Sequence, residues 1–254
     1  MTARIGLILD PLDLLFFRDG RPFEAGLRVG STTIFPQTLT GAVRTALLDQ
    51  ADCDFPALAR STEAGRSFSE ALADQSGELV DIAAISVRGP WFFRDGEPLL
   101  PVPAPLLSKK GGPIVRLAPL KATLPGWVPD EPHMLPLWTR SSGRAERLSG
   151  YLTINGMRQF LGGDVPDHGQ IVEADQLVET EPRTGIAVSP GTMTAAEGMI
   201  YTADYLALKP GVSLYAELSG PDGTVTGAFA AEAAIPLGGQ GRYVRVHRLP
   251  EPMA

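Results

Sequence analysis

The sequence predicts an α+β protein rich in short strands. Glycine (28) and proline (23) together make about a fifth of the 254 residues, against roughly 12% in average proteins, and this excess favours turns over long helices. Strand-like and helix-like stretches also follow one another in a mixed order, which is typical of a sheet covered on one side by helices. Hydrophobic residues make up 44% of the chain, and a chain of this length can bury a substantial core.

The first half predicts a buried strand, two similar hairpins and a helix. Arg4–Asp10 forms an apolar run that ends at a proline. Phe16–Gly20 and Phe92–Gly96 each place Arg-Asp-Gly after aromatic residues, and Asp-Gly is a hairpin signal. The two copies arose by duplication of one unit or by independent use of the same turn. Proline is favoured in a first helical turn, and a helix beginning near Pro36 has an apolar face of Leu39, Val43, Ala46 and Leu47.

The second half predicts helices, several strands and a domain boundary. A helix over Ile154–Leu161 should end at Gly162-Gly163, and small residues over Phe229–Ala234 predict another helix after a turn at residues 220–223. Strands are expected at Gly185–Val188, Met199–Leu208, Val212–Leu218 and Arg242–Leu249. The Pro- and Gly-rich stretch 98–136 is expected to be irregular. It divides the chain into an N-terminal domain, residues 1–125, and a C-terminal domain, residues 126–254.

The negative charge of the chain is concentrated in one segment. Residues 49–81 carry eight acidic and two basic side chains, a balance of −6 out of a net charge of −7. The remaining surface is therefore free to carry basic patches that bind nucleic acid. Of the 22 basic residues 18 are arginine, which suits bidentate phosphate contacts, although a GC-rich genome produces the same bias.

Conventional catalytic and cofactor motifs are missing from the sequence. Neither a phosphate-binding Walker loop nor a dinucleotide-binding glycine motif nor a serine hydrolase elbow occurs. The three histidines, His133, His168 and His247, lack metal-ligand spacing. Cys53 lies between Asp52 and Asp54, which raise the pKa of a thiol. We therefore expect no catalytic residues, no metal and no cofactor. No apolar run is long enough for a membrane span, and with a single cysteine a cytoplasmic location is expected.

The C-terminal region holds the strongest functional signal. Gly238-Gly239-Gln240-Gly241-Arg242 places three glycines and an arginine directly before a strand. Such a loop lets main chain approach an anion closely and present N–H groups to it; a plain tight turn has the same composition. In the strand that follows, alternation directs Val244 and Val246 to the core and Tyr243, Arg245 and His247 outward, an arrangement suited to stacking on single-stranded bases or to ordinary polar cover.

The chain resembles the family of the third subunit of the Cmr complex, the type III-B CRISPR effector, within the RAMP superfamily. The resemblance lies in five stretches, spread in order over nearly the whole chain: Asp10–Phe23, Phe35–Arg44, Gly150–Leu152, Glu181–Ile186 and Gly238–Arg242. The first and the last of these stretches are the more specific. Gln240 departs from the pattern, because relatives often have an acidic residue there.

The resemblance implies two tandem ferredoxin-like (RRM-like) units, with the glycine-rich loop in the second. It implies a non-catalytic subunit that binds the repeat-derived 5′ tag of the crRNA and caps the backbone filament. The neighbours in this hetero-oligomeric complex would be the large polymerase-like signalling subunit and a backbone RAMP subunit. The RNA-contact candidates from matching stretches and from the final strand are Arg18, Arg21, Arg44, Arg183, Gly238, Gly239, Gln240, Gly241, Arg242, Tyr243 and Arg245.

Two other functions are compatible with the same sequence. One is a metal-independent endoribonuclease of the same superfamily that processes CRISPR repeat RNA, with His247 or Tyr243 as general base. The other is a structural cap that touches protein neighbours and little RNA, with the acidic segment 49–81 as a protein-facing surface. For Arg183, a surface ion pair with Glu179 or Glu181 is the alternative to an RNA contact.

Overall fold

The computed structural model of the chain describes residues 2–18, 28–29, 34–109, 112–120, 126, 128, 131, 134–139, 145–189, 191–192 and 194–253, and of residues 28–29, 187 and 195–201 only the backbone. The chain forms two compact units: a larger unit of residues 1–96 and 178–254, and a smaller unit of residues 97–177. The larger unit is therefore built from both ends of the sequence. The division expected at residue 125 falls inside the smaller unit.

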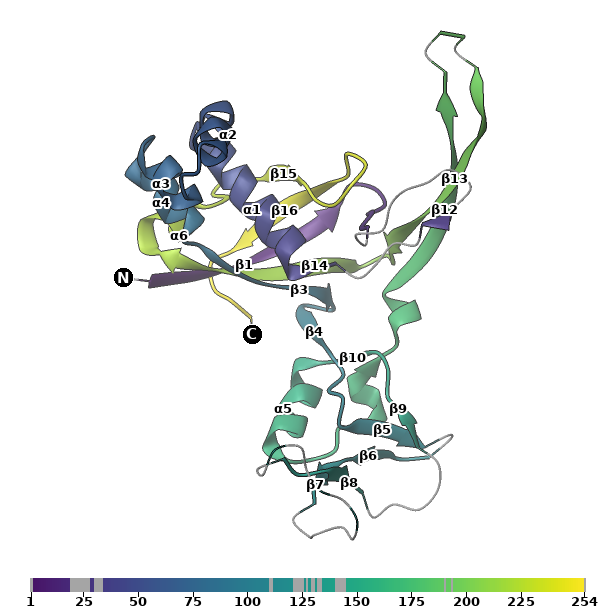
Figure 1. Ribbon diagram of the computed structural model, residues 1–254. Coiled ribbons are helices and arrows are strands. Elements are labelled where there is room, and N and C mark those ends of the chain that lie inside the picture. Colours follow the sequence, from purple (N-terminus) through teal and green to yellow (C-terminus); the bar gives the residue numbers. More distant parts are fainter. Residues whose placement is uncertain are drawn as a thin grey trace. The chain divides into compact units, whose positions relative to one another are not determined.

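Five strands of the larger unit pair antiparallel as part of one sheet (Figure 1). These strands, in spatial order, are β3 (Ser86–Arg94), β14 (Val212–Pro221), β1 (Thr2–Pro11), β16 (Tyr243–Leu249) and β15 (Ala233–Pro236). In β1 the buried Ile5, Leu7 and Leu9 point to one face, as the period of a strand requires. The large antiparallel sheet and its helices confirm the α+β class that the sequence predicts.

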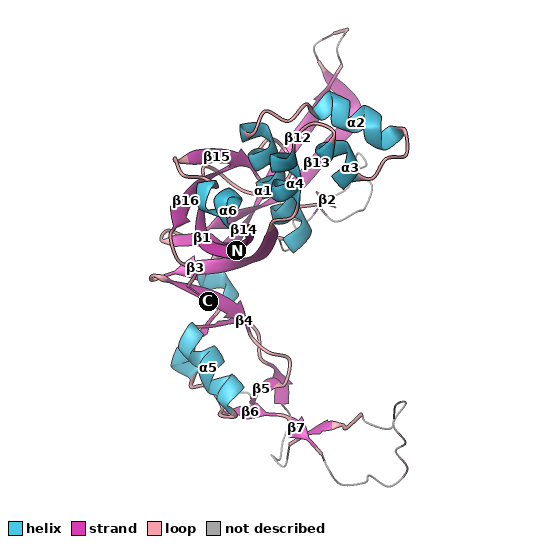
Figure 2. Ribbon diagram, turned by 90° about the vertical axis from the view of Figure 1, so that its left-hand side faces the viewer, coloured by secondary structure: helices cyan, strands magenta, loops and turns pink. Residues whose placement is uncertain are grey.

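Helices cover that apolar face of the sheet (Figures 1 and 2). They are α1 (Pro36–Gln50), α2 (Phe55–Glu63), α3 (Phe68–Ala73), α4 (Gly77–Ala83) and α6 (Asp222–Gly227). Leu39 and Val43 of α1 are fully buried in the core that the helices share with the sheet. Without its insertions the unit runs β1, α1, β3, β14, α6, β16, and these four strands lie in the order β3-β14-β1-β16.

A long two-stranded ribbon leaves the larger unit (Figure 1). It consists of β12 (Val178–Val188) and β13 (Ala195–Leu208), which pair antiparallel, with β2 (Arg28–Val29) parallel to β13. An isolated ribbon of two strands is only marginally stable in water, so its base needs support. Leu206 supplies it through two main-chain hydrogen bonds with Leu15, of 2.9 and 2.8 Å.

The smaller unit combines short strands with one helix. Its strands are β4 (Glu97–Pro101), β5 (Leu106–Lys109), β6 (Ile114–Arg116), β7 (Ala118–Pro119), β8 (Leu137–Trp138), β9 (Ala145–Arg147), β10 (Tyr151–Leu152) and β11 (Ile171–Val172). The helix α5 (Ile154–Gly162) begins where the Thr153 side chain accepts a hydrogen bond from the N–H of Gly156, and it ends at Gly163, whose φ is +105°. Leu106, Ile114, Leu148 and Leu152 form the core.

Most of the elements expected from the sequence are present, but one expected helix is wrong, and the stretch 98–136, expected to be irregular, holds the short strands β4 to β7. The first strand, the helix from Pro36, the helix from Ile154 and the last strand are confirmed. The range Phe229–Ala234, expected as a helix, is instead a loop after α6 followed by the start of strand β15. Phe229 has a φ of +50°, which no α-helix contains, and Ala233–Pro236 pairs with β16. Tertiary pairing therefore overrides the helix propensity of the alanines.

Candidate nucleic-acid interface

The glycine-rich loop joins β15 to β16, and Phe16 holds its first two glycines. Gly238 has a φ of +84°, and a Cβ there would lie 2.5 Å from the Phe16 carbonyl oxygen; the N–H of Gly239 donates to that same oxygen at 2.8 Å. Gln240 and Gly241 form the exposed tip, with φ of +61° and +62°. At Gly238 the close main-chain approach that the sequence predicts is therefore made to Phe16 of the same chain. The tip of the loop faces solvent.

Two candidate arginines from distant parts of the sequence meet over one aromatic ring. The Arg242 guanidinium lies 4.8 Å from the centre of the Tyr205 ring, and the Arg183 guanidinium lies 5.6 Å from it. Tyr205 is only 8% exposed because these arginines and Phe16, whose ring centre is 5.1 Å away, surround it. Cation–π contacts of this kind hold a guanidinium in place without consuming its N–H donors.

Each of these arginines also contacts a carboxylate. Arg242 donates through Nη1 to Asp13 Oδ2, and Arg183 donates through Nε to Glu181 Oε1 at 2.8 Å. The Glu181 hydrogen bond is the main cause that raises the pKa of Arg183. We name Asp13, Glu181, Arg183, Tyr205 and Arg242 the arginine cluster. Asp13 and Tyr205 were not among the residues predicted from the sequence, because only the fold brings them to Arg242.

The exposed face of β16 continues from the glycine-rich loop. Val244 and Val246 are buried, and Tyr243, Arg245 and His247 are exposed, which confirms the alternation predicted from the sequence. Tyr243 is 46% exposed and directly follows Arg242. Arg245 pairs with Glu232 at 2.9 Å, and His247 Nε2 lies 3.2 Å from Asp10 Oδ2. A pocket of about 350 Å³ lies between the end of β1 and the β13–β14 connection, with Asp10, Asp13 and Lys209 in its wall.

Of the other predicted arginines, Arg44 is used inside the larger unit and Arg18 is exposed. Arg44 on α1 donates through Nε and Nη2 to the carbonyl oxygen of Ile85, at 3.2 and 2.7 Å. This forked bond joins the helix to the start of β3, so Arg44 has a structural task in the larger unit. Arg18 is exposed and follows Phe16 and Phe17, which hold the glycine-rich loop. Arg21 lies outside the described residues.

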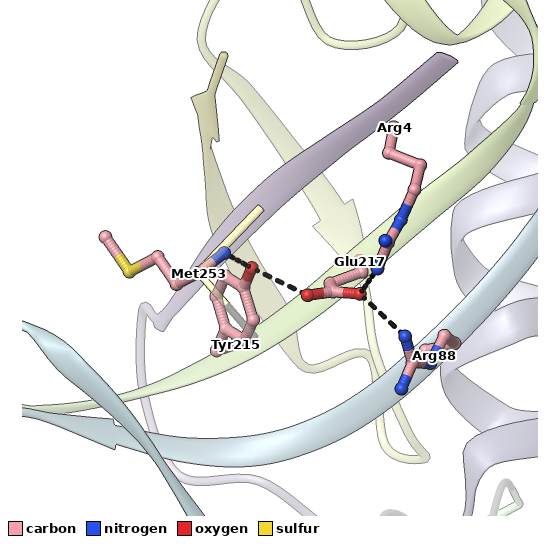
Figure 3. Close-up of polar contacts among 5 residues, drawn as sticks. All are labelled: Arg4, Arg88, Tyr215, Glu217 and Met253. Carbon is pink, nitrogen blue, oxygen red and sulfur yellow. Dashed lines mark hydrogen bonds and ion pairs between the residues drawn. The ribbon is translucent and has the colours of Figure 1, made fainter. Parts of the chain in front are cut away.

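The sheet face opposite the helices holds a polar group that the sequence did not predict (Figure 3). Glu217 is 1% exposed and pairs with Arg4 at 2.7 Å and with Arg88 at 3.2 Å. Tyr215 is fully buried beside it, because the C-terminal segment crosses this face: the Met253 N–H donates to the Tyr215 hydroxyl at 2.6 Å. Burial is the main cause that raises the pKa of Tyr215. At Tyr215 this face is therefore closed to a ligand.

Histidine, cysteine and carboxylate side chains do not converge on a metal site in the described part of the chain. Within the described ranges, no group of three or more His, Cys, Asp or Glu side chains is placed to hold a metal ion. Of the histidines, His247 pairs with Asp10, His168 lies in a short 3₁₀ helix over His168–Gln170, and His133 lies outside the described residues. No helix in the described part is long and apolar enough to cross a membrane.

Comparisons with known proteins point to one family. The profile of the family described as CRISPR-associated protein (Cas_Cmr3) matches residues 7–251. No curated protein matches the sequence. Among solved structures, a chain in a cryo-EM structure of the type III-B Cmr-beta bound to cognate target RNA is similar, with a TM-score of 0.53, 14% identity, and coverage of 95% of this chain and 63% of that chain. A chain of the same type of complex bound to cognate target RNA and AMPPnP has a TM-score of 0.51 and 15% identity, with coverage of 95% and 62%. The chain thus spans less than two thirds of the length of these structural relatives.

Proposed function

The chain belongs to the Cas_Cmr3 family of CRISPR-associated proteins, and from this premise we propose that it is a non-catalytic RNA-binding subunit of a type III-B Cmr effector complex. In this proposal it binds the repeat-derived 5′ tag of the crRNA and caps the backbone filament. The family match over residues 7–251 and the fold similarity to chains of RNA-bound Cmr-beta structures support this assignment.

The observation that carries the proposal is the arginine cluster next to the exposed loop tip. Arg183 and Arg242 are held over the Tyr205 ring, and Gln240, Gly241 and Tyr243 are exposed beside Arg242. Guanidinium groups bind phosphate oxygens, exposed main-chain N–H groups add donors, and a tyrosine ring stacks on bases. A single-stranded RNA finds all three kinds of contact there.

The architecture supports the same assignment. The strand order β3-β14-β1-β16, with α1 and α6 on one face, fits a ferredoxin-like (RRM-like) unit. RNA-binding units of this kind use aromatic residues on the open sheet face, but here the C-terminal segment covers Tyr215 on that face. We therefore assign RNA binding to the arginine cluster and the glycine-rich loop. A second ferredoxin-like unit remains part of the proposal.

The proposed neighbours are the large polymerase-like subunit and a backbone RAMP subunit. The eight acidic residues of 49–81 are all exposed on or beside α1 to α4, and RNA would be repelled there. That surface therefore suits contact with protein. In this arrangement the subunit holds the guide at the arginine cluster and meets a protein partner at the acidic helices.

A ribonuclease is the second candidate, and one contact favours it. The imidazole of His247 lies 3.2 Å from Asp10 Oδ2, and Asp10 also accepts a hydrogen bond from Ser213. A carboxylate that orients an imidazole is a common feature of general bases. The two candidates differ in one result, which is cleavage of RNA.

The first test uses the assembled complex with Arg242→Gln and Arg183→Gln. We expect each variant to weaken binding of a labelled crRNA 5′ tag about 3- to 10-fold at fixed salt, and to make the dependence of log Kd on log salt shallower by about 0.7, the effect of losing one phosphate contact on a single strand. The measurement is a fluorescence anisotropy titration at several salt concentrations.

Arg66→Gln is the matched control, because Arg66 is an exposed arginine paired with Asp74 in the acidic helical region. Tag affinity that is equal in the wild type and both cluster variants would refute the proposal. Incubation of repeat RNA with the chain in EDTA provides the second readout. Cleavage that disappears in His247→Ala would replace the proposed function with the ribonuclease.

A further inference from the structure

The arginine cluster carries no net charge in the free chain. Its arginines, Arg183 and Arg242, are matched by Glu181 and Asp13. A phosphate strand is attracted by unmatched cations, and its affinity falls when anions remain beside them. RNA that binds to Arg242 must therefore share the guanidinium with Asp13 or displace the Asp13 carboxylate.

Asp13 is well placed to hold Arg242 before RNA arrives. The N–H of Leu14 donates to the Asp13 carboxylate and is the main cause that lowers its pKa, with the charges of Arg242 and Arg183 lowering it further. The carboxylate is thus ionised at neutral pH. Asp13 is 51% exposed, and the Arg242 side chain is 19% exposed, so the acid lies on the solvent side of the pair.

The bond between Asp13 and Arg242 leaves part of the guanidinium unused. Arg242 donates through Nη1, and its buried Nε has no acceptor among the described residues. A fork-like bidentate contact, the strongest arrangement for arginine and an oxyanion, is therefore not formed. A phosphate oxygen offers Arg242 the same acceptor chemistry as the carboxylate. Asp13 also lines the pocket of about 350 Å³ at the end of β1, which gives a displaced carboxylate room to turn away.

We propose that Asp13 sets the RNA affinity of this subunit: its carboxylate occupies Arg242 in the free chain, and a phosphate oxygen of bound RNA takes its place. This inference rests on the proposed function, because it requires RNA at the arginine cluster. Its consequence is that the free subunit binds single-stranded RNA weakly. Only an RNA that makes further contacts at the glycine-rich loop and β16 compensates for losing the Asp13–Arg242 pair.

The test is Asp13→Asn in the full chain, with a fluorescein-labelled 12-nucleotide single-stranded RNA of mixed sequence as the probe. Asparagine keeps the shape and an oxygen acceptor but removes the competing charge. We expect the Kd to fall about 3- to 10-fold, and the dependence of log Kd on log salt to steepen by up to about 0.7. Asp13→Ala should also tighten binding, although it removes the hydrogen bond to Arg242.

The matched control is Asp81→Asn, the same change in charge at an exposed position of α4, which should change the Kd less than twofold at 150 mM salt. Arg242→Gln combined with Asp13→Asn should lose the gain, which shows that the gain acts through Arg242. Thermal unfolding of every variant verifies the fold.

The inference and the proposed function fail in different ways. If Arg242→Gln weakens binding but Asp13→Asn leaves it unchanged or weakens it, Asp13 only positions Arg242, and the inference is overturned. A gain as large in Asp81→Asn as in Asp13→Asn overturns it as well. If Arg242→Gln and Asp13→Asn both bind RNA like the wild type, the cluster is not an RNA site and the proposed function fails too.

Discussion

At position 238 the main chain turns with a φ of +84°, and a Cβ there would lie 2.5 Å from the carbonyl oxygen of Phe16. Residues with a side chain rarely adopt this conformation, and the distance leaves no room for a Cβ. The contact also fixes the start of the glycine-rich loop, because the next N–H, of Gly239, donates to that oxygen. The position of Arg242 at the end of the loop thus depends on Gly238.

Gly238→Ala should therefore lower the free energy of unfolding by about 1–3 kcal/mol, the usual cost of strained backbone. Gly41→Ala is the matched control, because Gly41 is an exposed residue inside α1 with no atom within 4 Å of an added Cβ. It should raise the free energy of unfolding by about 0.5–1 kcal/mol. Urea unfolding measures both changes, and equal midpoints for Gly238→Ala and the wild type would show that the close approach is absent in solution.

The raised pKa of the Cys53 thiol is a property that the sequence already indicates. Burial is the main cause that raises the pKa of its thiol, and the charge of Asp54 raises it further. The neighbouring carboxylate is visible in the sequence, and only the burial required the fold. Asp13, by contrast, pairs with Arg242, and no local sequence pattern predicts a pair between residues so far apart in the chain.

Three adjacent strands are joined by one buried carboxylate. Glu217 on β14 accepts from Arg4 on β1 and from Arg88 on β3, and its side chain is 1% exposed while the arginines are 45% and 56% exposed. A buried carboxylate is stable only when its charge is compensated. Either arginine alone supplies one positive charge.

We expect Arg4→Ala and Arg88→Ala each to cost about 1 kcal/mol or less, and the double variant to cost about 3–5 kcal/mol, because it removes both arginine charges that lie against the buried Glu217 carboxylate. The measurement is a double-mutant cycle by urea unfolding at neutral pH. Arg66→Ala, which breaks an exposed pair, should cost less than about 1 kcal/mol. Strict additivity of the two single variants would contradict the shared role of Glu217.

Elements with a strong local pattern were predictable, and those decided by pairing were not. The period of Leu39, Val43 and Leu47 identifies α1, and the alternation of Val244 and Val246 identifies β16. The alanines before Pro236 have helix propensity, yet they pair with β16 as β15. The glycine-rich loop was located correctly from its composition, but its contact with Phe16 was not visible because Phe16 is distant in the sequence.

At the scale of the molecule, the acidic residues of 49–81 are separated from the arginine cluster. Figure 1 shows α3 and α4 near the start of β1, whereas the loop between β15 and β16 lies toward the other end of that strand. Charges farther apart than the Debye length, about 8 Å at 0.15 M salt, are largely screened. A net charge of −7 is therefore compatible with RNA binding.

Replacing Asp52 and Asp81 by Asn, and Glu63 and Glu78 by Gln, removes four exposed negative charges from the helical region. At 150 mM salt this variant should bind RNA within about twofold of the wild type, and at 10 mM, where the Debye length is about 30 Å, several-fold more tightly. Anisotropy titrations at both concentrations test this. A several-fold gain already at 150 mM would mean that the acidic helices lie within reach of the bound RNA.

The larger unit is built from two separate parts of the chain, and the sequence does not show that they belong together. A composition rich in Pro and Gly marks residues 98–136 as a boundary, and that region does lie outside the larger unit. Nothing local, however, shows that the chain returns afterwards to pair β14 and β16 with β1. The composition therefore locates part of the smaller unit, and only the strand pairing shows that this unit is inserted into the larger one.

The insertion of the smaller unit has a consequence for biosynthesis. Arg4 and Glu217 are 213 residues apart, and a ribosome that adds about 5–20 residues per second needs about 10–45 s to cover that separation. During this time β1 lacks both strands that pair with it, β14 and β16. The main-chain N–H and C=O groups along both edges of β1 therefore stay without their strand partners until the last strands leave the exit tunnel.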